Sequence, residues 1–367
     1  MSVLSNTEFN IVELRKHFVI DGDFVGYEVI SDGLINNTFL LTFKKDGTES
    51  KYILQQINTV AFKNPEGLMQ NIFGVTEYLK KVDGEKSCRS TLSFHKTTDG
   101  NTFYRDDEGR CFRVYDYIDK AYTCQKIERP EQFYNAGKAF GDFQRKLADY
   151  PIDTLFETIP KFHNTANRFN NLKIAIAENK SGRADDVKEE IEFALQREAD
   201  TRVLLDLVDE GKIPVRVTHN DTKLNNVLFD EETHEGICVI DLDTIMPGLS
   251  LYDFGDAIRF GANKAAEDEK DVSLVDIDFE LYEAFTKGFL ETAGKSLTET
   301  EIKYLPFAAK LMTFECGMRF LTDYIDGDVY FKTKYPEHNL VRTRTQFALV
   351  KAIEDNYDKL LEITLRG

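Results

Sequence analysis

The 367-residue sequence is poor in positive charge: 46 Lys and Arg residues face 64 Asp and Glu residues, for a formal net charge of −18. Nucleic acids and anionic membranes select for basic surfaces, so this balance argues against either as the main partner. No apolar run approaches the roughly 18 residues of a membrane span, and the first residues do not form a secretory signal. We therefore expect a cytoplasmic protein with no nucleic-acid partner and no membrane partner.

Cysteine is scarce and scattered. The five cysteines include no CxxC pair, and with the 6 histidines they form no cluster with zinc-site spacing. Such a set is typical of reduced thiols and not of a disulfide framework. Four histidines are isolated in the sequence, and we expect none of them to be a ligand or a catalyst: His17, His95, His163 and His338.

Two parts of the chain differ in their hydrophobic patterns. Residues 25–58 and 91–118 contain short strand-like runs separated by Asp-Gly and Glu-Gly turns. Between them a helix is expected to begin at Asn64, where Asn-Pro-Glu combines an N-cap, a first-turn proline and an acid at the positive end of the helix dipole. From about residue 130 the patterns are mostly helical, apart from a strand-rich segment at 213–243.

These patterns predict an α+β fold in two parts. The N-terminal part is an antiparallel sheet with one helix, and the C-terminal part is larger and mostly helical. We place the boundary where periodicity is lost before Pro130, which gives domains of residues 1–120 and 121–367. A ligand-binding cleft is expected at their junction.

The densest polar cluster lies in the strand-rich segment. Its loop contains Asp221 and, five residues later, Asn226, and a second acid, Asp241, follows at the end of the next apolar strand. Phosphoryl transfer needs a carboxylate beside the attacking hydroxyl, together with an amide oxygen and a further carboxylate that hold magnesium on the nucleotide phosphates. The pattern predicts Asp221 as the base, and Asn226 and Asp241 as metal ligands. The alternative is a polar turn whose side chains only cap backbone groups.

The Asp-Phe-Gly sequence at 253–255 spells the magnesium motif of protein kinases in another context. It stands 32 residues after Asp221 and follows a loop, not a strand, at the start of an expected helix. We therefore assign the metal to Asp241. We expect Asp253 to cap that helix or to brace the loop, and His219 to orient Asp221 or the loop backbone.

At these residues the sequence resembles a known family. The loop and strand look like those of the aminoglycoside phosphotransferase and choline kinase group, and later stretches are similar to the N-acetylhexosamine 1-kinases within it: RVTHNDTKLNN, IDLDTIMPG, DFGDAIRFGA, ECGMRFL and KYPEHNLVRTRTQ. The resemblance covers nearly the whole chain. It implies a two-lobed, protein-kinase-like fold in which the N-terminal lobe binds ATP. With Mg²⁺ as the second cofactor, the enzyme would phosphorylate the anomeric hydroxyl of a sugar substrate, an N-acetylhexosamine (GlcNAc or GalNAc).

The resemblance also assigns residues. The base and the magnesium ligands named above match those of the family. Arg319 and Tyr330 match residues that contact the sugar, and Phe260 matches a position near the sugar pocket. Spacing alone would make Arg319 a cation on a helix surface. Lys223, close to the base, is expected to point at the γ-phosphate or the sugar.

The nucleotide side carries weaker signals. The loop at 31–38 has one glycine, Gly33, with which to fold over phosphates. The strand position at which most kinases carry a phosphate-pairing Lys holds Gln55, which brings no charge. Leu34 stands where the similar kinases have a histidine near the sugar. By resemblance, the adenine edge would meet the backbone at Tyr115, Asp116 and Tyr117.

Two alternatives stay open. In the first, the acceptor is another small hydroxyl compound, such as choline or an aminoglycoside. Quaternary amines are often bound in aromatic cages with Trp, and the chain has none. In the second, the protein is a nucleotide-binding sensor that no longer catalyses. Gln55 favours this alternative, and the intact set of base and metal ligands argues against it.

Overall fold

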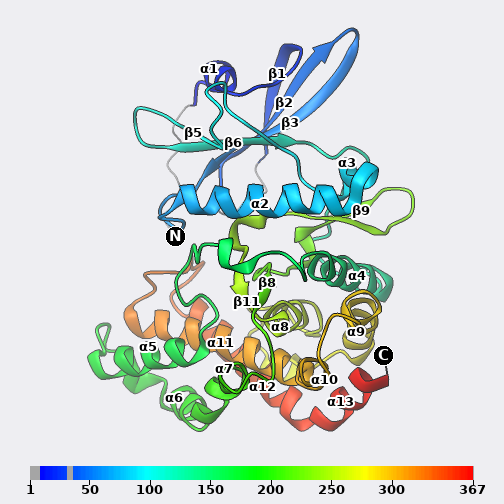
Figure 1. Ribbon diagram of the computed structural model, residues 1–367. Coiled ribbons are helices and arrows are strands. Elements are labelled where there is room, and N and C mark those ends of the chain that lie inside the picture. The colour runs from blue at the N-terminus through cyan, green and yellow to red at the C-terminus, as the bar shows by residue number, and fades with distance from the viewer. Residues whose placement is uncertain (1–8, 31–35, 367) are drawn as a thin grey trace. The chain divides into compact units, whose positions relative to one another are not determined.

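A computed structural model describes residues 9–30 and 36–366, which form two compact units (Figure 1). The first contains the chain up to Ala121 and two short segments that return to it, Asp153–Pro160 and Ile240–Ile245. The second contains the remainder. The predicted N-terminal antiparallel sheet and largely helical C-terminal region are confirmed, but the division at residue 120 did not anticipate the two returning segments.

The first unit is built on a six-stranded antiparallel sheet. The strand order is β1-β2-β3-β6-β4, and β5 pairs with β6. The turn between β2 and β3 places Asp46 and Gly47 at positive φ, as a tight hairpin turn requires. The strands are β1 (Asp23–Ile30), β2 (Thr38–Lys45), β3 (Thr48–Ile57), β4 (Phe94–His95), β5 (Tyr104–Arg105) and β6 (Cys111–Asp116).

Helices accompany this sheet. Helix α2 (Pro65–Asp83) begins as predicted, because the Asn64 side chain accepts a hydrogen bond from the N–H of Gly67. The short α1 (Ile11–Leu14), which was not predicted, buries Ile11 and Leu14 against apolar side chains of β2, β3 and β6. A further turn of helix, α3 (Ser87–Ser90), follows α2.

The second unit is mostly helical, with two small antiparallel strand pairs. Strand β8 (Arg216–Thr218) pairs with β11 (Met246–Gly248), and β9 (Val227–Asp230) pairs with β10 (Gly236–Val239). Strand β7 (Ala121–Tyr122), where the chain passes from the first unit to the second, adds a third strand beside β9, in the order β10-β9-β7. The helices are α4 (Pro130–Lys146), α5 (Thr165–Glu178), α6 (Lys188–Leu195), α7 (Val203–Asp209), α8 (Ser250–Gly261), α9 (Phe279–Ala293), α10 (Glu299–Lys303), α11 (Leu305–Asp326), α12 (His338–Asp355) and α13 (Tyr357–Arg366). Among the described helices, none combines the length and apolar character needed to cross a membrane.

Glycines let α4 and α9 pack backbone against backbone. A Cβ atom on Gly288 of α9 would lie 2.0 Å from the carbonyl oxygen of Tyr134, and one on Gly137 of α4 would lie 2.4 Å from that of Phe285. Both distances are far inside van der Waals contact, so these positions exclude any larger side chain.

We expect Gly288→Ala to lower the free energy of unfolding by about 1–3 kcal/mol, because overpacking a tight contact forces the backbone to move. Urea denaturation measures the loss. Gly26→Ala in β1 is the matched control, since no atom lies within 4 Å of the Cβ it would add. Equal urea midpoints for the two variants would contradict this account of the helix pair.

Candidate active site

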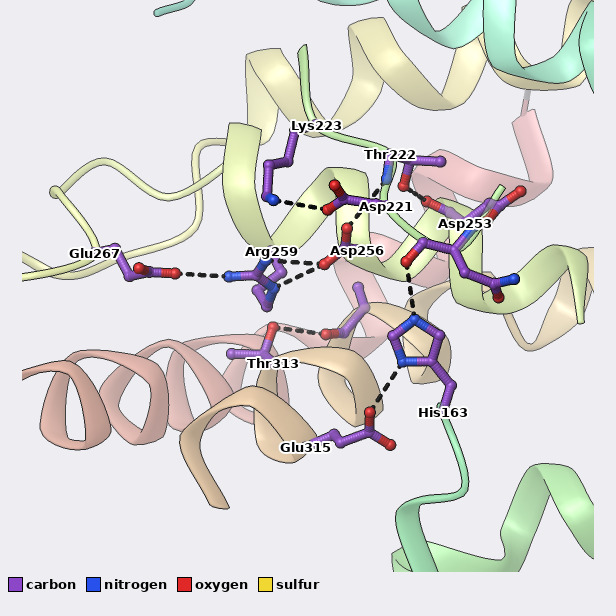
Figure 2. A network of polar contacts seen from close by, with 12 residues as sticks. His163, Asp221, Thr222, Lys223, Asp253, Asp256, Arg259, Glu267, Thr313 and Glu315 are labelled. Carbon is purple, nitrogen blue, oxygen red and sulfur yellow. Dashed lines mark hydrogen bonds and ion pairs between the residues drawn. The ribbon is translucent and has the colours of Figure 1, made fainter. Parts of the chain in front are cut away.

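The loop after β8 brings the predicted residues Asp221, Lys223 and Asn226 together, and Figure 2 shows the contact between the first two. The Asp221 carboxylate is partly exposed, and its Oδ1 lies 2.7 Å from Nζ of Lys223. The side-chain amide of Asn226 donates to the backbone oxygen of Asp221 at 2.7 Å and to its Oδ2 at 3.3 Å. These bonds hold the carboxylate in one orientation. They use the nitrogen of the Asn226 amide and leave its oxygen, the donor atom a metal ion needs, out of the contact.

Asp253 supports the backbone of this loop, which is one of the two roles predicted for it. Its carboxylate accepts the backbone N–H groups of His219 at 3.0 Å and Asn220 at 2.7 Å. Gln144 of α4 adds a third hydrogen bond, at 2.6 Å. Because both carboxylate oxygens are engaged by the loop and by Gln144, Asp253 serves as a loop anchor, although it belongs to an Asp-Phe-Gly sequence.

The surroundings of that sequence differ from the prediction in one respect. Residues 253–255 lie inside α8, as expected, but a strand does precede them: β11 pairs with β8, with Met246 opposite Thr218. The expectation of a loop there was wrong. A three-residue strand that contains Pro247 and Gly248 lacks the β-branched and aromatic residues that mark strands in sequence.

A second carboxylate, Asp256 of α8, also supports the loop. Its Oδ2 accepts the N–H of Thr222 at 3.2 Å, and its Oδ1 accepts two hydrogen bonds from Arg259, at 3.0 and 2.8 Å. Burial disfavours the charged form of Lys223, but the neighbouring carboxylates of Asp221 and Asp256 outweigh it, so the pKa of Lys223 is raised. Lys223 therefore remains a cation beside the candidate base.

Asp241 belongs to the first unit, within the segment Ile240–Ile245. Strand β10 ends at Val239, so Asp241 follows the strand by two residues instead of ending it, and it adopts a left-handed conformation with φ of 58°. A non-glycine residue pays for that conformation, which persists only where its surroundings enforce it.

Buried polar contacts enforce it by fixing this segment to the sheet. Oδ1 of Asp243 lies 2.5 Å from Nη1 of Arg113 in β6, and its Oδ2 accepts a hydrogen bond from Asn36 at 3.0 Å. The side chain of Asn71 in α2 donates to the backbone oxygen of Ile245 at 2.9 Å. Burial opposes the charge of Arg113, yet Asp243 raises its pKa, so the guanidinium stays protonated.

Arg113 also contacts Gln55, the residue at the position of the usual strand Lys. Oε1 of Gln55 accepts hydrogen bonds from Nε and Nη2 of Arg113, at 3.0 and 2.6 Å, and its Nε2 donates to Thr38. The positive charge that Gln55 lacks is therefore present on the neighbouring strand. Sequence reasoning missed Arg113, because a buried Arg inside an apolar strand reads as an ordinary alternating residue.

The other predicted nucleotide residues are only partly placed. Gly33 and Leu34 lie outside the described residues. Tyr115 and Asp116 end β6, and the N–H groups of Asp116 and Tyr117 donate to backbone oxygens of Ser93 and Lys51, at 2.9 and 3.1 Å. These two N–H groups are thus engaged within the unit, and an adenine contact at this segment stays a prediction.

The predicted sugar residues Arg319 and Tyr330 do come together. The guanidinium carbon of Arg319, on α11, lies 5.9 Å from the ring centre of Tyr330 and 5.5 Å from that of Phe331. Asp323 holds the segment that carries both rings, because its carboxylate accepts their backbone N–H groups at 2.7 and 2.9 Å. Phe260, near the end of α8, is 39% exposed.

Within the described part of the chain, no three His, Cys, Asp or Glu side chains gather as a metal site. A metal ion here would need amide and phosphate oxygens in addition to carboxylates, which is the donor set typical of magnesium bound to a nucleotide.

We expect Arg113→Met to lower the free energy of unfolding by about 3–5 kcal/mol, since it leaves the buried carboxylate of Asp243 without its partner. Chemical denaturation of the variant tests this. Arg105→Met is the matched control: Arg105 pairs with Glu66 at the surface of the same unit, where such a pair contributes only about 0–1 kcal/mol. The expectation fails if the two substitutions cost the same.

Comparison with known proteins places this geometry in context. Residues 26–287, more than half of the chain, match the model of a family described as a phosphotransferase enzyme family. A microcompartment-associated aminopropanol kinase is 14% identical and covers 95% of this chain and 97% of its own, with a TM-score of 0.60. An aminoglycoside phosphotransferase from Alicyclobacillus acidocaldarius is 12% identical and covers 97% and 98%, also with a TM-score of 0.60.

A third similar structure is a spectinomycin phosphotransferase in complex with ADP and spectinomycin. It is 15% identical, covers 94% of this chain and 93% of its own, and has a TM-score of 0.51. At such identities the likeness concerns the fold, and it confirms the protein-kinase-like, two-lobed fold expected from the sequence.

Proposed function

Because the chain belongs to the phosphotransferase enzyme family, we propose that it is a kinase that transfers the γ-phosphoryl group of ATP to the anomeric hydroxyl of an N-acetylhexosamine. The observation that carries the proposal is the oriented carboxylate of Asp221, held by Lys223 and Asn226 on a loop that Asp253 anchors. Preorganised groups of this kind are what phosphoryl transfer requires, since catalysis there rests on positioning and electrostatics.

In the proposed reaction Asp221 accepts the proton of the sugar hydroxyl. The hydroxyl oxygen forms a bond to the γ-phosphorus as the bond from that phosphorus to the bridging oxygen of ATP breaks, and ADP leaves. Lys223, kept cationic by Asp221 and Asp256, offsets the negative charge on the transferred group.

Asn226 and Asp241 are the proposed magnesium ligands. The side-chain oxygens of Asn and Asp are hard donors that suit this ion, and the Asn226 amide presents its nitrogen to Asp221, which leaves its oxygen for a cation. Bound magnesium would neutralise charge on the nucleotide phosphates. The contact between Arg113 and Gln55 supports a nucleotide role for the sheet unit, because it adds a fixed cation near the strand position where kinases usually have Lys.

Arg319 and Tyr330 are proposed to select the sugar. A guanidinium that stacks among aromatic rings keeps N–H groups for sugar hydroxyls or an acetamido oxygen, while an aromatic face covers the apolar side of a sugar ring.

The substrate is tested by measuring ADP release from ATP and Mg²⁺ with N-acetylglucosamine, N-acetylgalactosamine, glucose, galactose, choline and kanamycin. We expect selective release with the two N-acetylhexosamines. Selective release with choline or kanamycin would replace the proposed acceptor but keep the kinase. Binding of ATP without turnover on any of these compounds would favour a nucleotide sensor.

Asp221→Asn should retain ATP binding and lose turnover by about 100-fold or more, because an amide cannot accept the hydroxyl proton. Nucleotide titration and steady-state ADP release measure the two effects separately. In this variant the new side-chain oxygen can still accept a hydrogen bond from Asn226, so the loop should keep its thermal stability. Turnover at the wild-type rate would refute Asp221 as the base.

A further inference from the structure

A buried histidine that the sequence analysis set aside reaches the candidate catalytic loop. Nδ1 of His163 lies 2.9 Å from Oε1 of Glu315 in α11, and its Nε2 lies 3.1 Å from the backbone oxygen of Asn220 (Figure 2). The side chains of His163 and Glu315 are only 6% and 1% exposed. Oε2 of Glu315 accepts a further hydrogen bond from the hydroxyl of Thr165, at 2.7 Å, so both of its oxygens have partners.

The geometry makes His163 a cation. Glu315 is ionised, because its pKa is lowered, so both ring nitrogens face oxygen atoms that only accept hydrogen bonds, a carboxylate and a peptide carbonyl, and both carry protons. Burial alone would lower the pKa of His163, but Glu315 and the Asn220 carbonyl raise it above the ordinary value for histidine. Burial alone would raise the pKa of Glu315, but His163 outweighs burial, so the pKa of Glu315 is lowered.

Of the other groups that face His163, one carboxylate favours the imidazolium form and two rings are neutral. Asp256 of α8 contributes a negative charge that raises the pKa of His163. Tyr252 of α8 packs its ring 5.4 Å from the imidazole, and burial raises the pKa of its phenol, which stays neutral. Phe162, whose ring lies 4.4 Å away, carries no charge.

The carbonyl that His163 holds belongs to the peptide unit just before Asp221. The N–H of that same unit points to Nδ1 of His219, at 3.3 Å, and Asn220 itself is in a left-handed conformation with φ of 65°. The plane of this peptide sets the direction in which the Asp221 side chain leaves the backbone. Its carbonyl is held by a charged donor, which makes a stronger hydrogen bond than a neutral one.

Glu315 connects this peptide to the helix of the proposed sugar contact. It lies four residues before Arg319 on α11, and residues at this spacing lie on the same face of a helix. The chain of contacts therefore runs from α11 through Glu315 and His163 to the backbone beside the base.

We propose that His163 and Glu315 form a positioning pair: protonated His163 fixes the peptide that precedes Asp221, and Glu315 ties that peptide to helix α11. The inference rests on the proposed function for the role of Asp221, whereas the held peptide itself is a property of the folded chain. Neither residue touches a reacting atom. Their effect is on the orientation of the base.

The pair makes loop order depend on pH in one direction. Since the pKa of His163 is raised on folding, its contribution is complete below the ordinary histidine pKa and is lost as the pH rises through the folded-state value. Once one ring nitrogen loses its proton, a lone pair faces an acceptor oxygen. Wild-type kcat should therefore fall on an alkaline limb, with little change in the KM for ATP.

The double variant His163→Gln/Glu315→Gln tests the proposal, because it removes both charges and leaves no unpaired buried carboxylate. We expect it to fold, to lose about 10- to 100-fold in kcat through misplacement of the base, and to lack the alkaline limb. His163→Gln alone should show the same kinetic loss together with lower stability. Wild-type kcat and an unchanged pH profile in the double variant would overturn the proposal.

Glu354→Gln is the matched control. This substitution likewise removes a carboxylate of the second unit, here a half-buried one that pairs with Arg197 and Lys310. It should lower stability without moving the pH profile. A profile altered equally by Glu354→Gln would show that the effect is general destabilisation, and would count against the positioning pair.

A readout without turnover separates this proposal from the proposed function. In protein labelled with ¹⁵N-histidine, the imidazole of His163, identified by its absence in His163→Gln, should remain doubly protonated at pH 7. Its deprotonation should coincide with faster amide exchange in residues 219–226. A neutral imidazole at pH 7, or equal loop exchange in the wild type and the double variant, would refute the pair even if no substrate is found.

Discussion

The candidate site depends on one buried interaction, the acceptance of two consecutive backbone N–H groups by the carboxylate of Asp253. The loop that carries Asp221 has no repeating hydrogen-bond pattern of its own, so its backbone groups need side-chain partners. Asp253 supplies two of these partners from α8. Asp256, three residues further along the same helix, supplies another by accepting the N–H of Thr222. Helix α8 is thus the rigid element that supports the loop of Asp221, the proposed base.

In the sheet unit a segment is again held by a buried charged side chain, but there the charge is positive. There the buried cation Arg113 pairs with Asp243 and so holds the segment that contains Asp241. Arg113 also donates a hydrogen bond to Gln55. Buried ion pairs add little net stability because desolvating both charges is costly, yet removing one partner is expensive. Such pairs are therefore better suited to fixing one arrangement of a loop than to raising the stability of the fold.

Two cations of this acidic chain, Lys223 and His163, contact the loop that carries Asp221. With a formal net charge of −18, the protein as a whole repels a nucleotide triphosphate. Lys223 and His163 nevertheless stay protonated beside carboxylates, as their raised pKa values indicate. Local pairing, and not net charge, decides whether an anion can approach such a site.

The residues alone predict the strands of the sheet, the start of α2 at Asn64 and the cluster of Asp221 with Asn226, because each depends on neighbours within a few residues. The folded chain was needed to show that residues 240–245 join the sheet unit, and that His163 lies beside Glu315, 152 positions away in sequence. Contacts of this kind leave no periodic signal. A buried charge finds its partner through packing, and an isolated histidine in a sequence carries no mark of the carboxylate that will stabilise its protonated form.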